Sequence, residues 1–475
     1  MNSTALSESD KPFPPRYWWL KRLSLALAAA LIALTIVRII WGYDAQRRYD
    51  RAIQAIRARG EPILPEDFDA PHIPDDANRV HYLNLAISAI NPNADPPAAT
   101  NMAYPSYLPM SSEWMSVAKT AWEANQDALR YARQARSYTK VDWGVRFRSP
   151  VINQILTPLG HQRRLANLLG DMAVYQHIQG NDAQALELIQ DLFAQADALR
   201  EQPTLVSQLV AVGIDLLAAA RLEVIAPGLR LADDPATAPT TQSVTPATHQ
   251  QAKILISRLL DARRVGIAQA MLSERMLLAD QMAVLTSRSL LLRPMYLMSV
   301  VQAFPIFDQV RAAATQPTNI LAQQALPPAL PIATGSTGFH QFPGSVFLPA
   351  FNRAIETQMC VRMEHHLAAV IVACRLYQVD HAGRWPEKLE DLVPDYLPDV
   401  PVDPFSQTGQ PLKYLLARNG TRPIVYSVGE DGKDNTPDDS VLPPEPQSGW
   451  IRLGLDQWRD ISRFTPPPQT QPAEQ

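Results

Sequence analysis

The stretch LANLLGDMAVYQHIQGNDAQALELIQDLFAQADAL, residues 165–199, carries the clearest hydrophobic pattern in the chain. One apolar face precedes the triplet Gly180-Asn181-Asp182 and a second follows it; their members are Leu165, Leu168, Met172, Tyr175 and Ile178, then Leu186, Ile189, Phe193, Ala196 and Leu199. Steps of three and four residues place these side chains on one side of an α-helix, which a neighbouring helix must cover. The stretch therefore predicts two helices joined by a turn at residues 180–182.

Helical patterns continue on both sides of this hairpin, over residues 76–90, 113–135, 205–225 and about 250–288. Asp215 and Arg221 interrupt the apolar run 205–225, whose uncharged part is too short for a bilayer, so we expect a core helix there. The hairpin resembles one tetratricopeptide-type unit, but no repeat of about 34 residues follows it. We therefore predict a mainly α protein whose body, residues 44–314, is a helical bundle or irregular solenoid.

Near the N-terminus, residues 23–37 read LSLALAAALIALTIV, which is apolar and uncharged, and Arg38 and IIWGY follow. The uncharged run is slightly shorter than the roughly 20 residues that span a bilayer. Arg38 can extend to the headgroups, however, which adds residues 39–43 to the span. Aromatic residues suited to the membrane interface stand at both edges: Tyr17, Trp18, Trp19, Trp41 and Tyr43. We predict a tail at 1–16, a transmembrane anchor at 17–43 and a helical stalk at 44–59.

A cleaved signal peptide is the main alternative to this anchor. Its apolar region would cover about 7–15 residues and would end at small residues. Here the small residues 28–30 lie inside the run and arginines follow it, which favours an uncleaved signal-anchor. Positive charges flank the run almost equally, with Lys11, Arg16, Lys21 and Arg22 before it and Arg38, Arg47, Arg48 and Arg51 after it. The charge balance therefore leaves the orientation undecided.

The net charge, the proline content and the two cysteines limit which functions and which local structures the chain can have. A net charge of -4 without a basic stripe argues against a nucleic-acid partner. Proline is frequent, at 42 of 475 residues, and its clusters predict a linker at 315–350 and a disordered tail at 461–475. The two cysteines, Cys360 and Cys374, lie on one expected helix about 21 Å apart, too far for a disulfide, so we expect apolar packing.

The region 351–460 has its own pattern. Residues 352–380 read as a helix, 387–392 as a short helix, and 412–415 and 424–428 as two antiparallel strands. Its ordered motifs include Leu376, Tyr377, Asp380, the segment 383–386 (GRWP), Pro401, Asp403, Pro404, Pro411, Tyr414, Tyr426, Ser427, Gly429, Asp431, Gly432, Thr436, Asp438 and Asp439. On these residues the region resembles the periplasmic domain of the major (G-type) pseudopilin of type II secretion systems. The whole chain, including PHIPDD at 71–76, resembles large membrane-anchored proteins of planctomycete-type bacteria.

The loop after the second strand is acidic, with Glu430, Asp431, Asp434, Asp438 and Asp439 relieved by Lys433. Crowded carboxylates repel one another unless a cation neutralises them, and calcium accepts 6–8 oxygen ligands. The pseudopilin resemblance implies a calcium site with Ser427, Asp431, Asp438 and Asp439 as side-chain ligands. A solvated acidic turn without an ion is the alternative. The N-terminal anchor lacks the pseudopilin prepilin-peptidase pattern and lies far upstream, so we expect the fold without filament assembly.

Catalytic motifs are not evident in the sequence. The segment Glu364-His365-His366 is not H-E-x-x-H, and we interpret it as a solvated or half-buried helix face and not as a zinc site. The leading hypothesis is a non-enzymatic, single-pass membrane-anchored envelope protein with an extracytoplasmic body, protein partners and no identified small-molecule substrate. The alternatives are an accessory component of a type II secretion-like system and a cryptic envelope hydrolase.

Overall fold

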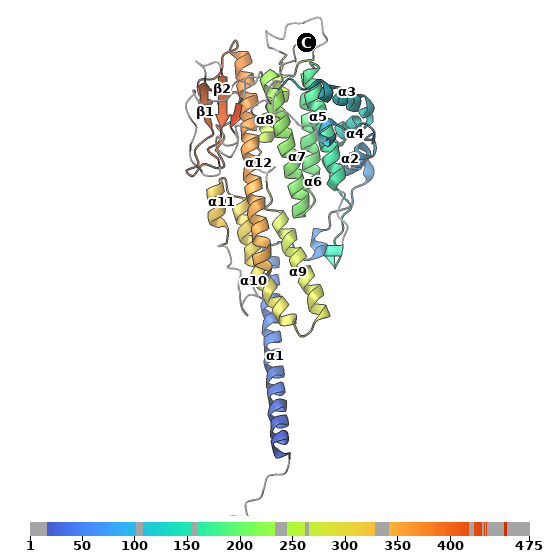
Figure 1. Cartoon of the computed structure of the whole chain (residues 1–475), viewed down its shortest axis with the longest axis vertical. Helices are drawn as coiled ribbons and strands as arrows, with labels where there is room; N and C mark the ends of the chain where they lie inside the picture. The colour runs from blue at the N-terminus through green and yellow to red at the C-terminus, as the bar shows by residue number, and fades with distance from the viewer. Residues whose placement is uncertain are drawn as a thin grey trace, which may run out of the picture.

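The computed structural model describes residues 17–100, 108–153, 159–232, 245–261, 266–327, 342–417, 422–429, 432, 434 and 451–453. Within them the protein is mainly α-helical, as expected, with one small sheet (Figure 1). The helices are α1 (Trp18–Ala58), α2 (Arg79–Ser88), α3 (Ser112–Ala124), α4 (Gln126–Arg136), α5 (Leu159–Ile178), α6 (Asp182–Arg200), α7 (Leu205–Ile225), α8 (His249–Leu259), α9 (Ala270–Arg288), α10 (Arg293–Ala314), α11 (Asn319–Ala325) and α12 (Phe342–Asp380). The strands are β1 (Lys413–Ala417), β2 (Arg422–Tyr426) and β3 (Ile451–Leu453). The expected tails, 1–16 and 461–475, lie outside the described residues.

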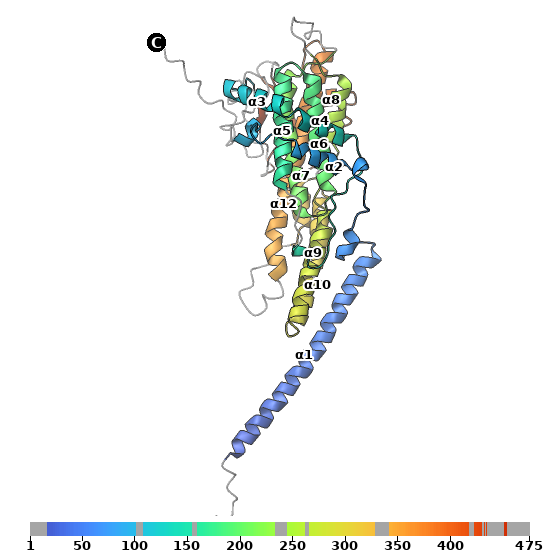
Figure 2. The ribbon, with the colours of Figure 1, turned by 90° about the vertical axis from the view of Figure 1, so that its right-hand side faces the viewer.

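Helix α1 extends from one end of the body and leans away from it (Figure 2). Among the described residues it is the one helix long and apolar enough to cross a membrane. Its large apolar side chains are exposed, for example Leu25 at 74% and Leu34 at 65%. The same helix continues without a break through Ala58, which confirms the predicted helical stalk.

The stalk is joined to the body by apolar packing and by a network of charges. A small core forms where α1 ends, from Ile56, Ile63, Ala279, Val300 and Phe304. Beside it, Glu61 accepts hydrogen bonds from Arg59 at 3.0 Å and pairs with Arg275 at 2.9 Å and Arg311 at 2.8 Å. The fully buried Arg275 also pairs with Asp308 at 2.9 Å. A buried guanidinium needs such partners, so removing one carboxylate should weaken the joint.

Helices α5 and α6 form the predicted hairpin around a turn in which Gly180 has a φ of +88°. The predicted apolar faces are buried, except that Ile178 is half-buried. Helices α4, α5, α7 and α8 also surround α6, so several of its polar side chains are buried as well: Asp182, Gln190, Asp191 and Gln195. Buried aspartates of this hairpin are paired with arginines of other helices: Asp191 of α6 binds Arg133 at 2.7 Å, and Asp171 of α5 binds Arg221 at 2.9 Å.

Two expected helices are interrupted, and side-chain hydrogen bonds accompany both breaks. The helix expected at 113–135 divides into α3 and α4 at Asn125, whose amide donates to the backbone oxygens of Ala121 and Ala94. The helix expected at 250–288 ends at Leu259 and resumes at Ala270. Between them the N–H of Ile267 binds the Gln358 side chain at 3.0 Å instead of a helical carbonyl.

Helix α12 confirms the helix expected at 352–380 and begins earlier, at Phe342. It packs on α7, α8 and α10, so one hydrophobic core includes both the body and the start of the C-terminal region. Cys360 is half-buried and Cys374 is buried on this helix, and no disulfide joins the two. The expected linker 315–350 contains α11 and the first turns of α12 among its described residues.

The small sheet lies beside α12, on the side of the body opposite α2, α3 and α4 (Figure 1). Strands β1 and β2 are antiparallel, with Tyr414 opposite Val425, which confirms the predicted pair. The three residues of β3 add a parallel strand beside β2. The short helix expected at 387–392 is a 3₁₀ turn, Leu389–Leu392.

The joint at Glu61 generates a prediction with a defined pH dependence. Burial favours the protonated carboxyl, but hydrogen bonds from Arg59 and Arg275 outweigh it and lower the pKa of Glu61 from 4.5 to about 2. A carboxyl whose pKa is lowered by folding stabilises the protein above its unfolded value, and this contribution is lost as the pH falls towards the folded value. We expect Glu61→Gln to reduce the free energy of unfolding by about 1.5–3 kcal/mol at neutral pH.

The measurement is thermal or denaturant unfolding of the full chain between neutral pH and the acid limit of folding. The difference between Glu61→Gln and the unmodified chain should shrink below pH 4.5. Glu66→Gln is the matched control, because Glu66 is exposed on the neighbouring turn. Equal destabilisation at every pH would contradict the assignment of the charge network as the cause.

Candidate functional site

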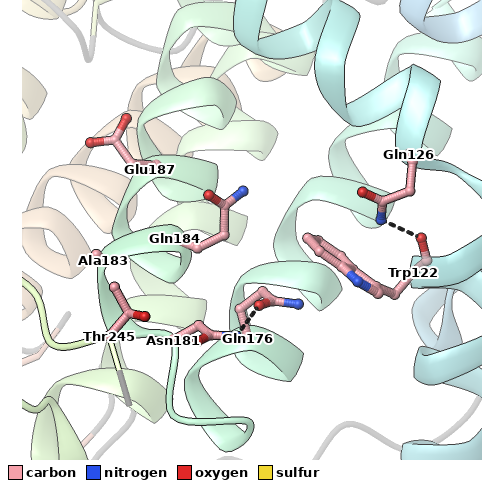
Figure 3. A pocket seen from close by; sticks show the side chains of 8 residues that line it. All are labelled: Trp122, Gln126, Gln176, Asn181, Ala183, Gln184, Glu187 and Thr245. Carbon is pink, nitrogen blue, oxygen red and sulfur yellow. Dashed lines mark hydrogen bonds between the residues drawn. The ribbon is translucent and has the colours of Figure 1, made fainter. Parts of the chain in front are cut away.

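An open groove lies between the broken helix α3–α4 and the α5–α6 hairpin, with a volume of about 500 Å³ (Figure 3). Most of its polar lining consists of carboxamide side chains. The full lining is Trp122, Gln126, Gln176, Asn181, Ala183, Gln184, Glu187 and Thr245. Figure 3 shows the Trp122 ring pointing from its helix towards Gln176 and Gln184 across the groove.

The α3–α4 wall is formed by the break at Asn125. This side chain is fully buried, and its amide oxygen accepts a hydrogen bond from the Asn91 N–H at 2.8 Å. Trp122 precedes the break and Gln126 follows it, so the break brings both to the groove; the Gln126 amide donates to the Trp122 carbonyl at 2.6 Å. Behind Trp122 lies Tyr175, with ring centroids 6.4 Å apart. The position of the aromatic ring is therefore set both by the break at Asn125 and by helix α5.

The opposite wall is formed by the turn between α5 and α6. His177 and Asp182 are buried and hydrogen-bonded to each other, and Arg230 donates to Asp182 at 2.9 Å. The segment that carries Thr245 is held against the turn, because its N–H donates to the Gly180 carbonyl at 3.0 Å and its carbonyl accepts from Ala183 at 3.1 Å. These contacts fix the backbone on which the groove side chains stand.

The groove residues can donate and accept hydrogen bonds together. Each carboxamide has two N–H donors and a carbonyl acceptor, the same groups that a peptide backbone carries. Within the described residues the Gln184 carboxamide makes no hydrogen bond, whereas Asn181 donates to Gln176 at 2.8 Å. The arrangement suits a neutral, hydrogen-bonding ligand with an apolar part against Trp122.

Glu187 contributes the one acidic side chain of this lining, and its charge is already compensated. Burial alone would favour the protonated form, but hydrogen bonds from Arg136 and Gln251 lower the pKa of Glu187. Arg133 lies 3.7 Å from the same carboxylate. The groove therefore presents a balanced and not a negative surface.

A second, smaller cavity of about 210 Å³ is mostly apolar and lies beside the start of α7. Glu274 lines it and accepts a hydrogen bond from the Leu205 N–H at 3.0 Å. Burial raises the pKa of Glu274. The Glu274 carboxyl therefore has a structural role, because it accepts a hydrogen bond from an N–H in the first turn of α7 that has no partner within the helix.

Of the four residues expected to bind calcium, only Ser427 is described; Asp431, Asp438 and Asp439 lie outside the described residues. The Ser427 hydroxyl donates to Asp403 at 2.8 Å and accepts from the Gly429 N–H at 3.2 Å. In the part of the chain that the structure describes, no three acidic, histidine or cysteine side chains converge as a metal site.

Asp403 connects the turn at residues 403–405 to the end of β2 at residues 427–428, and we call this contact region the Asp403 corner. The sequence did not reveal this role. Asp403 is fully buried and accepts hydrogen bonds from the N–H groups of Phe405 and Val428, both at 2.9 Å, besides the Ser427 hydroxyl. Burial raises the pKa of its carboxyl, while these three donors favour the charged form. The Asp-Pro pair of the turn motif was the one signal that could have pointed to it.

The solvated or half-buried helix face expected at residues 364–366 is wrong for Glu364 and His365, which are buried because other elements cover this side of α12; His366 is half-buried. His365 is fully buried and meets the Phe193 ring edge-to-face at 6.2 Å, whereas the His366 ring is within 2.8 Å of the Val402 carbonyl. Burial lowers the pKa of His366 to about 4. Adjacent positions on a helix point in different directions, and here they contact different elements.

Comparison with known proteins finds no match to a family model, to a curated protein or to a solved structure. The function is therefore inferred from the geometry of the described residues.

The Asp403 corner yields a stability prediction. Asp403→Asn replaces one acceptor oxygen by an amide group that must face a backbone N–H or the Ser427 hydroxyl. We expect a loss of about 1–3 kcal/mol in the free energy of unfolding, measured by denaturant titration of the full chain.

Asp399→Asn is the matched control, because Asp399 is an exposed aspartate on the same connecting segment. If both variants unfold at the same denaturant concentration as the unmodified chain, Asp403 does not stabilise this corner.

Proposed function

We propose that this protein is a non-enzymatic, single-pass membrane-anchored envelope protein whose helical body binds an extended segment of a partner polypeptide. The observation that carries the proposal is the groove between the broken helix α3–α4 and the α5–α6 hairpin, lined by carboxamides and one tryptophan. The apolar, exposed half of α1 supports the anchoring. The orientation proposed for the body is extracytoplasmic, and the acidic C-terminal loop is its basis.

The chemistry of the lining favours a polypeptide. An extended strand offers a backbone N–H and C=O at each step of about 3.4 Å, and carboxamides pair with both. Gln126 stands on one wall and Gln184 on the other, so a strand between them would be contacted from both sides. Trp122 would cover an aliphatic or proline side chain. A glycan could use the same groups, and the test below separates the two.

The full chain in detergent should bind members of a library of immobilised unstructured peptides. Trp122→Ala should weaken that binding about tenfold or more, and Gln184→Ala roughly two- to tenfold, because each lost hydrogen bond contributes about 0.5–1.5 kcal/mol. The readout is the dissociation constant of the best peptide.

Gln323→Ala serves as the control, since Gln323 is an exposed glutamine on α11. Binding of a glycan array in place of peptides, or peptide binding that survives both groove substitutions, would overturn the proposed ligand class.

We further propose that the C-terminal region has a pseudopilin-like fold that calcium stabilises. The two antiparallel strands after a long helix support this, as does Ser427 at the end of β2, where the acidic loop begins. Asp431, Asp438 and Asp439 would supply the charged oxygens, with Ser427 as a neutral ligand.

A ligand that binds only the folded state raises stability, by about 2.7 kcal/mol at a hundredfold excess over its dissociation constant. Calcium should therefore raise the melting temperature of the full chain, and a chelator should reverse the increase. The double variant Asp438→Asn, Asp439→Asn should lose the response, whereas Asp399→Asn should keep it. A melting temperature indifferent to calcium would refute the site and leave the groove proposal standing.

A further inference from the structure

The turn between α9 and α10 exposes three consecutive leucines. Leu290 is 74% exposed, Leu291 73% and Leu292 40%. Arg288 and Arg293 flank them and are also exposed. Apolar side chains at a loop tip with cationic neighbours are unfavourable in water and match the boundary between lipid chains and headgroups.

This tip, residues 289–293, is held against α1 at three successive levels. The Arg38 guanidinium donates to the carbonyl oxygens of Leu290 and Leu291, the second at 3.0 Å. One turn further along α1, Gly42 faces the start of α10, because a Cβ added at Gly42 would be in van der Waals contact with the Pro294 ring, at 3.8 Å. Arg293 then donates to the Gln46 side chain at 2.7 Å. The height of the tip along α1 is therefore fixed.

That height coincides with the edge of the apolar half of α1. Arg38 lies 20 residues after Trp18, which is about 30 Å of helix and equals the thickness of a hydrocarbon core. With Trp18 at one interface, the Arg38 side chain reaches the opposite interface, where a charged group is tolerated. The leucines whose carbonyls it binds are at the same level.

We propose that the α9–α10 tip inserts Leu290, Leu291 and Leu292 into the leaflet through which α1 leaves the membrane. This second membrane contact rests on the proposed anchoring by α1. Arg288 and Arg293 stand where they would meet the phosphates of anionic lipids. Because α1 is also bound to α9 and α10 at the Glu61 joint, the two contacts hold the body in one orientation on the bilayer.

Depth-dependent fluorescence quenching of the full chain in vesicles of phosphatidylcholine and phosphatidylglycerol tests this contact. Leu291→Cys, in a chain that also carries Cys360→Ala, is labelled with an environment-sensitive fluorophore; Cys374 is fully buried, which shields its thiol from the label. The control positions are Leu31→Cys within the apolar half of α1 and Ile254→Cys, exposed on α8. A sample without an added cysteine corrects for background labelling.

We expect the label at residue 291 to emit at shorter wavelength than the label at 254. Lipids with a nitroxide near the headgroup should quench it at least twofold more strongly than the label at 254, and aqueous iodide should quench it less. Quenching by lipid at 31 but not at 291 would overturn the inserted tip and keep the anchor. Failure at both positions would overturn the anchor and the tip together. A blue-shifted emission at 291 without lipid quenching would assign the tip to a protein contact and also overturn the inference.

Discussion

The buried guanidinium of Arg275 joins the long N-terminal helix to the body. It lies between Glu61, just beyond the end of α1, and Asp308 on α10, at 2.9 Å from each. A full charge without water is tolerated only with such compensation, so the position of α1 is tied to the packing of α9 and α10. The direction in which the body projects from the apolar half of α1 depends on this joint.

The joint between α1 and the body also defines which end of the body lies near α1 and which end lies far from it. The α9–α10 turn lies along α1, whereas α3 lies at the opposite end of the body (Figure 1). The carboxamide groove, between α3–α4 and α5–α6, is therefore away from the apolar half of α1. In a membrane-anchored protein this arrangement would place the groove outward, where the proposed partner chain could reach it without meeting lipid.

The elements that could be predicted are those whose sequence pattern is local, such as the periodicity of a helix or a glycine at a turn. The face from Leu165 to Ile178 and its partner from Leu186 to Leu199 follow helical periodicity, and Gly180 supplies the left-handed turn between them. The breaks at Asn125 and before Ala270 were not predicted, because each depends on hydrogen bonds to residues distant in sequence, Asn91 in one case and Gln358 in the other. The periodicity of a helix gives no information about hydrogen-bond partners that are distant in sequence.

The sequence by itself determined the apolar N-terminal helix, the α5–α6 hairpin and the antiparallel strand pair, since each is set by side chains that are neighbours along the chain. Only the tertiary structure decided that Trp122 and Gln184 face one groove, that Asp403 holds Ser427, and that Arg38 binds the α9–α10 tip. Arg38 and Leu291 are 253 residues apart. Contacts over such separations depend on how whole helices pack, and hydrophobic patterns specify which face of a helix is covered but not which helix covers it.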